Sequence, residues 1–170
     1  MQVAPTPDNE AERLTALHAL LILDTPPEQR FDKIVQFAAT EFDVPVVLIT
    51  LLDAERQWFK ARVGTDVCET GRDISLCSHA ILQPGIMVVP DTLEDPRFAD
   101  NPLVTGDLKV RFYAGAPLAM ASGLRLGTLC LIDHRPRTLD AMELGILGTL
   151  RDLVVMELNQ QSAVDEAPDA

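Results

Sequence analysis

Hydrophobic positions near the start of the chain recur with the spacing of a helix. Leu14, Leu17 and Leu21 form one stripe, and Asn9 with Glu12 has the spacing of a capping box. The pattern therefore predicts a first helix that begins directly after Asn9.

The segment DTPPE (24–28) ends this helix and prepares a second one. Thr25 suits the N-cap position, Pro26 suits the first helical position, and Glu28 stands where a capping box needs an acid. Five apolar residues then mark one helical face: Phe31, Ile34, Val35, Ala38 and Phe42. We expect a second helix that starts at Thr25 and runs to about residue 42.

After Pro45 the pattern becomes that of strands. VVLITLLD, from residue 46, is a nearly continuous apolar run rich in β-branched residues, as in a central strand covered on both faces. A short turn follows, and QWFKARVG (57–64) completes a hairpin. Simple alternation along this second strand separates two sets of side chains: Trp58, Lys60 and Arg62 on one face, and Phe59, Ala61 and Val63 on the other.

Three more strands are predicted further along the chain. They are IMVVPD (86–91), VRFYAGAPLAM (110–120) and SGLRLGTLCLID (122–133), and the last two form a second hairpin. The segment DPRFADNPLV (95–104) lies between the first two of these strands. Its two prolines indicate irregular loop and short helix.

From Thr138 onwards the helical period returns and fades near Gln160. One stripe of this terminal helix carries Leu147, Leu150, Val154 and Leu158. The first and last helices also have apolar residues beyond a single core-facing line: Leu20, Leu23, Ile146 and Leu153. We therefore expect a homodimer through the terminal helices.

The order of the elements defines the fold class. Hairpins imply an antiparallel sheet, and helices at both chain ends must cover sheet faces, so we expect an α+β layered domain. We assign this single domain to residues 9–160, after a flexible lead-in over residues 1–8 and before an acidic, frayed tail over residues 161–170.

Composition narrows the classes of partner. The 170 residues suit one domain, and 47% of them are hydrophobic, which is enough for a sizeable core. The formal net charge of −12 repels phosphates, so neither a nucleic-acid partner nor an anionic membrane surface is expected. The N-terminus lacks the pattern of a signal peptide, and the three cysteines are an odd count, so we expect a reducing cytoplasm.

The ordered motifs of the chain resemble those of the GAF domain family, in the subgroup often found at the front of bacterial signalling proteins. The segments that carry the resemblance are ILDTPPEQRFDKI (22–34), DAERQWFKARVG (53–64), RDISLCSHAIL (72–82), DTLEDPRFADNPLV (91–104), RFYAGAPL (111–118) and GTLCLIDHRPR (127–137). The resemblance covers roughly residues 9–160.

This resemblance implies a fold and a general role. The fold is a central antiparallel sheet of five or six strands, with the terminal helices packed on one face and loops or short helices covering a pocket on the other. The role is small-molecule sensing and dimerisation in signal transduction. Members of the family bind different ligands or none, so the family does not identify a cofactor, which stays unknown.

The segment DISLCSHAIL (73–82) places Cys77 two residues before His79, a pair that several kinds of chemistry use. A zinc site needs four ligands, and only Cys130 and His134 offer a second pair. A catalytic cysteine needs a base beside it. Some photoreceptor members of the GAF family attach a bilin to a cysteine that is closely followed by histidine.

Ordinary packing is the simpler interpretation of the same segment. Free cysteine is among the most buried residue types, and Cys130 also occupies a core position in a predicted strand. If Ser78 caps a short helix, Cys77 and His79 point in different directions. We then expect Cys77 to line the pocket and no metal to be bound.

Other side chains are candidates to line the pocket or to hold a ligand. Arg97 is expected either to pair with Asp91 or Asp95 or to bind an anion, and Phe98 is expected to anchor its loop. Alternation puts Arg111 and Tyr113 on one face, where they suit a carboxylate or phosphate, unless Arg111 pairs with Asp91 or Asp133. The candidate ligand-binding set is Trp58, Cys77, His79, Asp91, Arg97, Phe98, Arg111 and Tyr113.

The sequence thus predicts a non-catalytic sensory domain. It binds a small molecule and signals through its terminal helices to a separate or fused output domain. Two alternatives remain open at this point: a redox enzyme that depends on Cys77, and a structural dimerisation module without a ligand.

Overall fold

Six strands form one antiparallel sheet in the computed structural model, which describes the backbone of residues 1–166 and the side chains of residues 1–161. The strands are β1 (Val46–Leu52), β2 (Arg56–Val63), β3 (Glu69–Gly71), β4 (Met87–Val89), β5 (Phe112–Ala119) and β6 (Arg125–Asp133). Their order is β3-β2-β1-β6-β5-β4, and every neighbouring pair is antiparallel. The predicted fold class is confirmed, and β3 is a short edge strand that the pattern missed.

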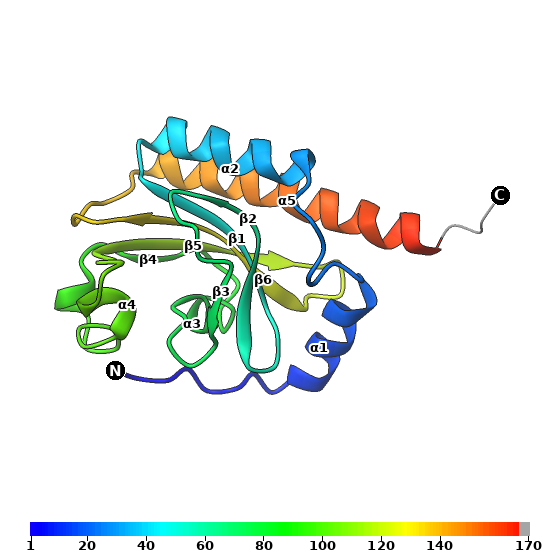
Figure 1. Cartoon of the computed structure of the whole chain (residues 1–170), viewed down its shortest axis with the longest axis horizontal. Coiled ribbons are helices and arrows are strands. Elements are labelled where there is room, and N and C mark those ends of the chain that lie inside the picture. The colour runs from blue at the N-terminus through cyan, green and yellow to red at the C-terminus, as the bar shows by residue number, and fades with distance from the viewer. Residues whose placement is uncertain (167–170) are drawn as a thin grey trace.

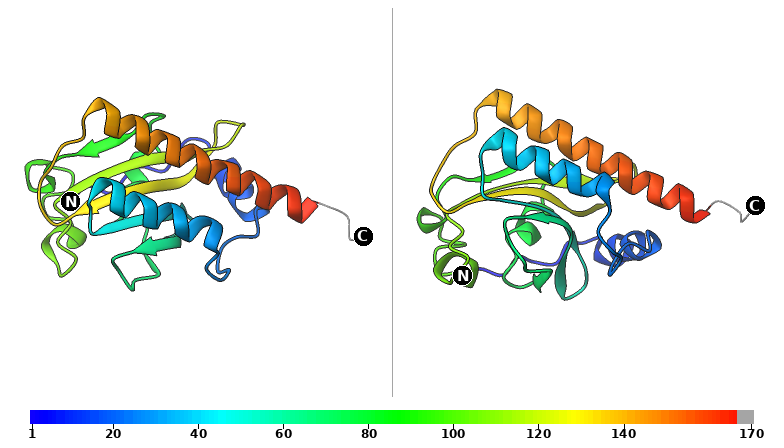
Figure 2. Two further views of the ribbon diagram at one scale, coloured as in Figure 1. Left: turned by 90° about the horizontal axis from the view of Figure 1, so that it is seen from above. Right: turned by 45° about the horizontal axis from the view of Figure 1, so that its top comes forward.

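Helices lie on both sides of this sheet. The long helices α2 (Gln29–Phe42) and α5 (Ala141–Glu166) lie side by side over one face (Figures 1 and 2). The first helix, α1 (Glu10–Ala19), lies at one end of the sheet (Figure 1). The opposite face carries the short helices α3 (Cys77–Ala80), η1 (Thr92–Glu94) and α4 (Pro102–Thr105) with their connecting segments.

The sheet separates two hydrophobic cores. On the helix side, Val47, Ile49 and Leu51 of β1 pack into the core that contains α2 and α5. On the other side, Val46 and Leu48 of the same strand pack into the core that contains α3 and α4. Since both faces of β1 are covered, its seven residues are all buried, which explains its continuous apolar run.

A β-bulge in β2 changes the alternation that the sequence predicts. Ile49 pairs with Ala61, whereas the next residue of β1 pairs with Phe59, so Lys60 is an extra residue in the ladder. Ala61 therefore joins Trp58 in the helix-side core, and the predicted placement of Ala61 with Phe59 is wrong.

The second helix begins later than predicted. Helix α2 starts at Gln29, after Glu28 in extended conformation, because Pro26 precedes another proline and is kept out of the helical region. Thr25 is therefore not an N-cap. Its hydroxyl donates to the carbonyl of Ile22 and accepts from the ammonium of the buried Lys60 at 2.8 Å.

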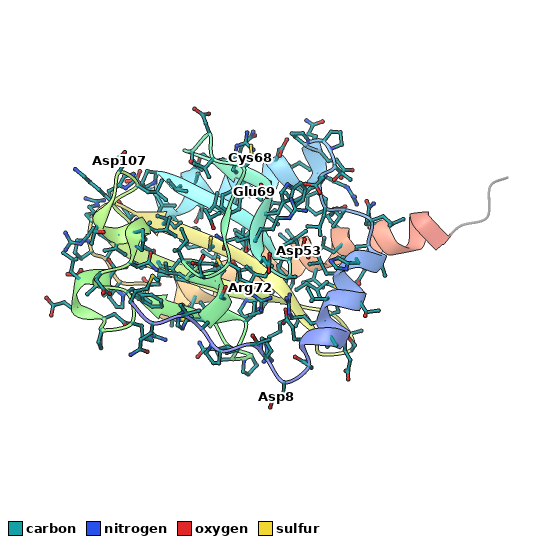
Figure 3. All side chains as sticks on the ribbon, turned by 60° about the horizontal axis from the view of Figure 1, so that its bottom comes forward. Asp8, Asp53, Cys68, Glu69, Arg72 and Asp107 are labelled. Atoms are coloured by element: carbon teal, nitrogen blue, oxygen red, sulfur yellow. The ribbon has the colours of Figure 1, made fainter. Side chains whose placement is uncertain are left out.

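Helix α1 is held by a buried arginine instead of the predicted capping box. The side chain of Asn9 makes no cap hydrogen bond, and Arg13 donates to the carbonyl oxygen of Leu52 at 2.7 Å. Glu10 pairs with Arg13 and also with Arg72. Arg72 in turn donates to the carbonyl oxygen of Asp53, and Figure 3 labels these two residues. Burial raises the pKa of the Glu10 carboxyl, but the two arginines outweigh this and lower the pKa to about 2.

The terminal helix is longer than the predicted one. It begins after Asp140, whose side chain and backbone exchange hydrogen bonds with Glu143 in a capping box, and it continues past Gln160 to Glu166. The predicted frayed tail is thus helical as far as Glu166, and its last residues, 167–170, lie outside the described part. Over residues 1–166, no helix is long and apolar enough to cross a membrane.

Candidate functional site

A small cavity lies between the sheet and the segment that joins β2 to β3, on the face away from α2 and α5. Its volume is about 30 Å³. Side chains of β1, β2, β5 and β6 form one wall: Val46, Leu48, Gln57, Phe59, Tyr113, Cys130 and Ile132. The roof consists of Thr65 and Val67 from the joining segment and Thr70 from β3, with Leu103, Leu108 and Val110 from around α4 and Leu76 and Cys77 from the start of α3.

The sulfur of Cys77 is the centre of a buried polar cluster beside this cavity. It accepts hydrogen bonds from the hydroxyls of Tyr113 at 3.0 Å and Thr128 at 3.1 Å. The Thr128 hydroxyl also lies 3.0 Å from that of Thr50 on the neighbouring strand. A sulfur that accepts two hydrogen bonds is stabilised as a thiolate.

The position of Cys77 depends on two serines that precede and follow it. The hydroxyl of Ser75 accepts from the backbone N–H of Ser78 at 3.2 Å and donates to the side-chain oxygen of Gln57. Ser78 donates its own hydroxyl to the carbonyl oxygen of Arg72, so the predicted N-cap role of Ser78 is wrong. The amide of this turn is instead capped by Ser75, and the helix already includes Cys77.

The pKa values of this cluster diverge. Burial raises the pKa of the Cys77 thiol, but hydrogen bonds from Cys130, Thr128 and Tyr113 outweigh it and lower the pKa to about 7. The interaction with Cys77, together with burial, raises the pKa of Cys130 well above its ordinary value. Burial also raises the pKa of Tyr113, which stays a hydrogen-bond donor. When the cluster loses a proton, Cys77 is the residue that becomes charged.

Of the eight candidate ligand-binding residues, Cys77 and Tyr113 line the cavity. Trp58 is buried on the opposite face of the sheet, in the core with α2 and α5. The remaining five lie outside the cavity lining, and their expected ligand contacts stay predictions.

His79 and Phe98 pack against each other beneath the N-terminal segment. Their rings meet edge to face with centroids 4.9 Å apart, and the Nε2 atom of His79 lies 3.0 Å from the carbonyl oxygen of Gln2. Phe98 is fully buried, so its predicted anchoring role is confirmed. His79 and Cys77 point to different partners, as the helical interpretation predicted.

The predicted arginines make local ion pairs. Arg111 contacts Asp91 at 3.1 Å, and Asp91 also accepts from the backbone N–H of Leu93. Arg97 contacts Asp95 at 2.8 Å. The pairing of Arg111 with Asp91, one of the two alternatives for this residue, is present, and a ligand contact of Arg111 stays a prediction.

Sequence reasoning missed three polar members of the site: Thr50, Thr128 and Gln57. Thr50 and Thr128 lie inside apolar strands, Gln57 lies near the start of β2, and all three are fully or almost fully buried. A buried hydroxyl or amide must find a partner, so this interruption of the pattern was the available signal. Within the described residues, no three His, Cys, Asp or Glu side chains gather in a group that could hold a metal ion.

Comparison with known proteins places these features in a family. The GAF domain family model matches residues 26–158. A curated cyclic di-GMP phosphodiesterase of Pseudomonas aeruginosa is 45% identical over 137 residues, which are 81% of this chain and 23% of that protein. The chain thus spans less than a quarter of that relative.

Solved structures share the fold at low sequence identity. The GAF domain of the Acinetobacter phosphoenolpyruvate-protein phosphotransferase superposes with a TM-score of 0.66 at 18% identity, over 92% of this chain and 98% of that one. The type II free methionine-R-sulfoxide reductase of Thermoplasma acidophilum gives 0.63 at 16% identity, over 85% and 95%. The blue-light absorbing form of the Thermosynechococcus elongatus PixJ GAF-domain gives 0.62 at 18%, over 90% and 92%.

Proposed function

This chain belongs to the GAF domain family, and from that premise we propose that it is a non-catalytic sensory module. A small molecule binds in the cavity beside Cys77, and the signal leaves through the terminal helix α5. The module works in the cytoplasm, a location that the unpaired state of Cys68, Cys77 and Cys130 supports.

The observation that carries this proposal is the wall that the cavity and the helices share. In β6, Cys130 and Ile132 line the cavity, while Leu129 and Leu131 pack into the core with α5. Strand β5 likewise has side chains on both faces of the sheet: Tyr113 lines the cavity, and Phe112 packs into the helix-side core. Since successive residues of a strand point to opposite faces, a ligand that shifts these strands also shifts the surface on which α5 rests.

The size of the cavity requires the roof to move. Pockets for organic ligands have volumes of roughly 300–1,000 Å³, whereas this cavity has about 30 Å³. The roof segment is held to β2 mainly by the three-residue strand β3 at the edge of the sheet. A ligand larger than a few water molecules therefore enters by displacing Thr65, Val67 and Thr70.

The output is supported by the relative and by the outer face of the helices. The relative is named as a cyclic di-GMP phosphodiesterase, and this chain matches only 23% of it, so we propose a separate or fused output domain of a signalling enzyme.

Four apolar side chains on α2 and α5 are exposed: Phe37 (53%), Met142 (76%), Leu153 (42%) and Met156 (56%). We propose that these form a homodimer interface. Of the four residues expected to extend beyond the core, Leu20 is buried, Leu23 and Ile146 are partly buried, and Leu153 is exposed.

A chimera tests this function directly. The matching segment of the Pseudomonas aeruginosa phosphodiesterase is replaced by this chain, and hydrolysis of cyclic di-GMP is measured with and without Leu108→Trp, which fills the cavity from its roof. We expect hydrolysis to change by about fivefold or more. The control is Leu93→Trp, at an exposed leucine outside the cavity. Equal hydrolysis by the unsubstituted chimera and by its Leu108→Trp and Leu93→Trp variants would contradict the proposal.

A second candidate function is a dimerisation module without a ligand, which the small size of the cavity favours. Native mass spectrometry of freshly purified protein separates the two. A non-covalent adduct that the Leu108→Trp variant does not retain supports the sensory function. The second function is supported if the protein carries no adduct and Leu108→Trp leaves cyclic di-GMP hydrolysis by the chimera unchanged.

A further inference from the structure

We propose that Cys77 and Cys130 form a peroxide-reactive dithiol, in which hydrogen peroxide entering the cavity oxidises the two thiols to a disulfide. This inference rests on the proposed function, because it names an oxidant as the small molecule that the same cavity senses. The thiols act stoichiometrically, so the protein stays a sensor.

The two sulfurs meet at one cavity although they come from different elements. Cys77 is the first residue of α3, and Cys130 lies in the middle of β6. Both are buried, both carry free thiols, and both line the cavity. The thiols also interact with each other, because the proton on Cys130 stabilises the charged form of Cys77. Cys68, the third cysteine, is exposed and outside the cavity lining.

Two hydroxyls prepare Cys77 to react. Tyr113 at 3.0 Å and Thr128 at 3.1 Å both direct their hydrogens at its sulfur. The thiolate is the form that attacks peroxides, and these donors keep it available near neutral pH. The interaction with Cys77 and burial raise the pKa of Cys130 more than the Thr128 hydroxyl lowers it, so Cys130 keeps its proton and is suited to the second step, in which a thiol resolves an oxidised partner.

The volume of the cavity selects the oxidant. A cavity needs about 10–15 Å³ to hold one water molecule, so the 30 Å³ beside Cys77 have room for one or two molecules of that size. Hydrogen peroxide, with two oxygen atoms, falls within this limit. Organic hydroperoxides and disulfides do not fit unless the roof moves.

The reaction balances in two steps. The Cys77 thiolate attacks one oxygen of peroxide, the O–O bond breaks, and the departing hydroxide takes the proton that Cys77 lost, giving water and a sulfenic acid. Cys130 then attacks the sulfenic sulfur, the S–O bond breaks, and the second hydroxide leaves with the proton of Cys130 as water. The two thiols lose two electrons together, and peroxide is reduced to two molecules of water.

A disulfide at this place ties α3 to the centre of the sheet. The neighbours of Cys130 in the sequence, Leu129 and Leu131, pack in the core beneath α5. Any adjustment of β6 to the bond therefore reaches the helix side. Oxidation of the two thiols would therefore reach α5 through β6, by the same route as the binding of a ligand in the cavity.

The test is peptide mapping of the whole chain after exposure to hydrogen peroxide at pH 7. Excess peroxide is removed with catalase, the protein is unfolded, and free thiols are blocked with N-ethylmaleimide before digestion. We expect a disulfide-linked peptide pair that joins Cys77 to Cys130, with a mass two hydrogens below the sum of the two reduced peptides. Cys68 should carry N-ethylmaleimide. Cys77 should be oxidised faster than Cys68, because the hydroxyls of Tyr113 and Thr128 stabilise its thiolate.

Variants identify the order of the steps. Cys130→Ala should stop the reaction at a Cys77 sulfenic acid that dimedone traps, and Cys68→Ser, the matched control, should still form the disulfide. The wild-type map is decisive even if a variant fails to fold. Two results of the peptide map would overturn the dithiol. In one, Cys77 and Cys130 both carry N-ethylmaleimide. In the other, Cys77 is oxidised beyond the sulfenic acid while Cys130 stays a free thiol.

The outcomes also separate this inference from the proposed function. If no disulfide forms but Leu108→Trp changes hydrolysis in the chimera, the dithiol is wrong and the sensory function stands. If the disulfide forms but neither it nor Leu108→Trp changes hydrolysis, the chemistry stands as a modification and the sensory function is wrong.

Discussion

The hydroxyl of Tyr113 donates a hydrogen bond to the sulfur of Cys77 at 3.0 Å, although 36 positions separate the two residues in the chain. The contact joins strand β5 to the first turn of α3. It needs Gly115, because a Cβ atom at that position would overlap the Tyr113 hydroxyl. The missing side chain of Gly115 is therefore part of the site.

Gly115→Ala should destabilise the protein by about 1–3 kcal/mol, because the new methyl group displaces the Tyr113 ring from a fully packed wall. The measurement is the free energy of unfolding in urea. Gly145→Ala serves as the control, since a Cβ there meets no neighbouring atom, and it should stabilise α5 by about 0.5–1 kcal/mol. Equal effects of the two substitutions would contradict the crowding at Tyr113.

Tyr113→Phe should raise the pKa of the Cys77 thiol by about one unit, since it removes one of the two hydroxyl donors to the thiolate. Thiolate absorbance near 240 nm, measured against pH and corrected with Cys77→Ser, reports this value. The wild-type thiol should titrate near its lowered pKa of about 7. A wild-type Cys77 thiol without a lowered pKa, or one whose pKa Tyr113→Phe leaves unchanged, would contradict the described hydrogen bonds.

Glu10→Gln should cost about 2–3 kcal/mol at pH 7, because it leaves the buried Arg13 without its carboxylate. The folded-state pKa of Glu10 is lowered from 4.5 to about 2, so this stabilisation is complete above pH 4.5 and is lost as the pH falls towards 2. Urea unfolding at several pH values should show a smaller loss of stability on acidification in the variant. Glu12→Gln, an exposed residue of the same helix, should behave like the wild type.

Leu153→Glu should weaken the proposed homodimer by about tenfold or more, because it places a charge in the apolar face of α5. Sedimentation equilibrium measures the effect. The control is Leu93→Glu, since Leu93 is similarly exposed but lies in η1 on the other side of the sheet. A wild-type monomer at high micromolar concentration would rule out the interface.

Much of the fold could be predicted because its signals are local. The apolar run of β1 and the stripe of α5 report their own burial, and the predicted hairpins are present. Simple alternation failed at Ala61, because a bulge depends on the partner strand and leaves no mark in the strand that contains it. The start of α2 was misplaced because two prolines follow Thr25 and delay the helix until after Glu28, and the Thr25 hydroxyl binds the buried Lys60 instead of a helix N-terminus.

The site was harder to predict than the fold. Cys77 and Tyr113, two of the candidate ligand-binding residues, line the cavity, but their contact joins α3 to β5 across 36 positions of the chain, which no short pattern encodes. The charged candidates Arg97 and Arg111 attracted attention as anion binders, yet each is paired with a neighbouring aspartate. The informative residues were the less conspicuous Thr50 and Thr128, which are polar residues buried in apolar strands.

If a change in the cavity is transmitted to α5 through the shared strands β5 and β6, it should alter hydrogen exchange in α5. Amide exchange is compared in the wild type, in Leu108→Trp and in the Leu93→Trp control, with buried β1 amides as the reference for global unfolding. We expect Leu108→Trp to change the exchange of the α5 segment around Leu147 and Val154, whereas Leu93→Trp should not change it. A change confined to the roof and α4, with α5 exchanging as in the wild type, would contradict transmission through the strands.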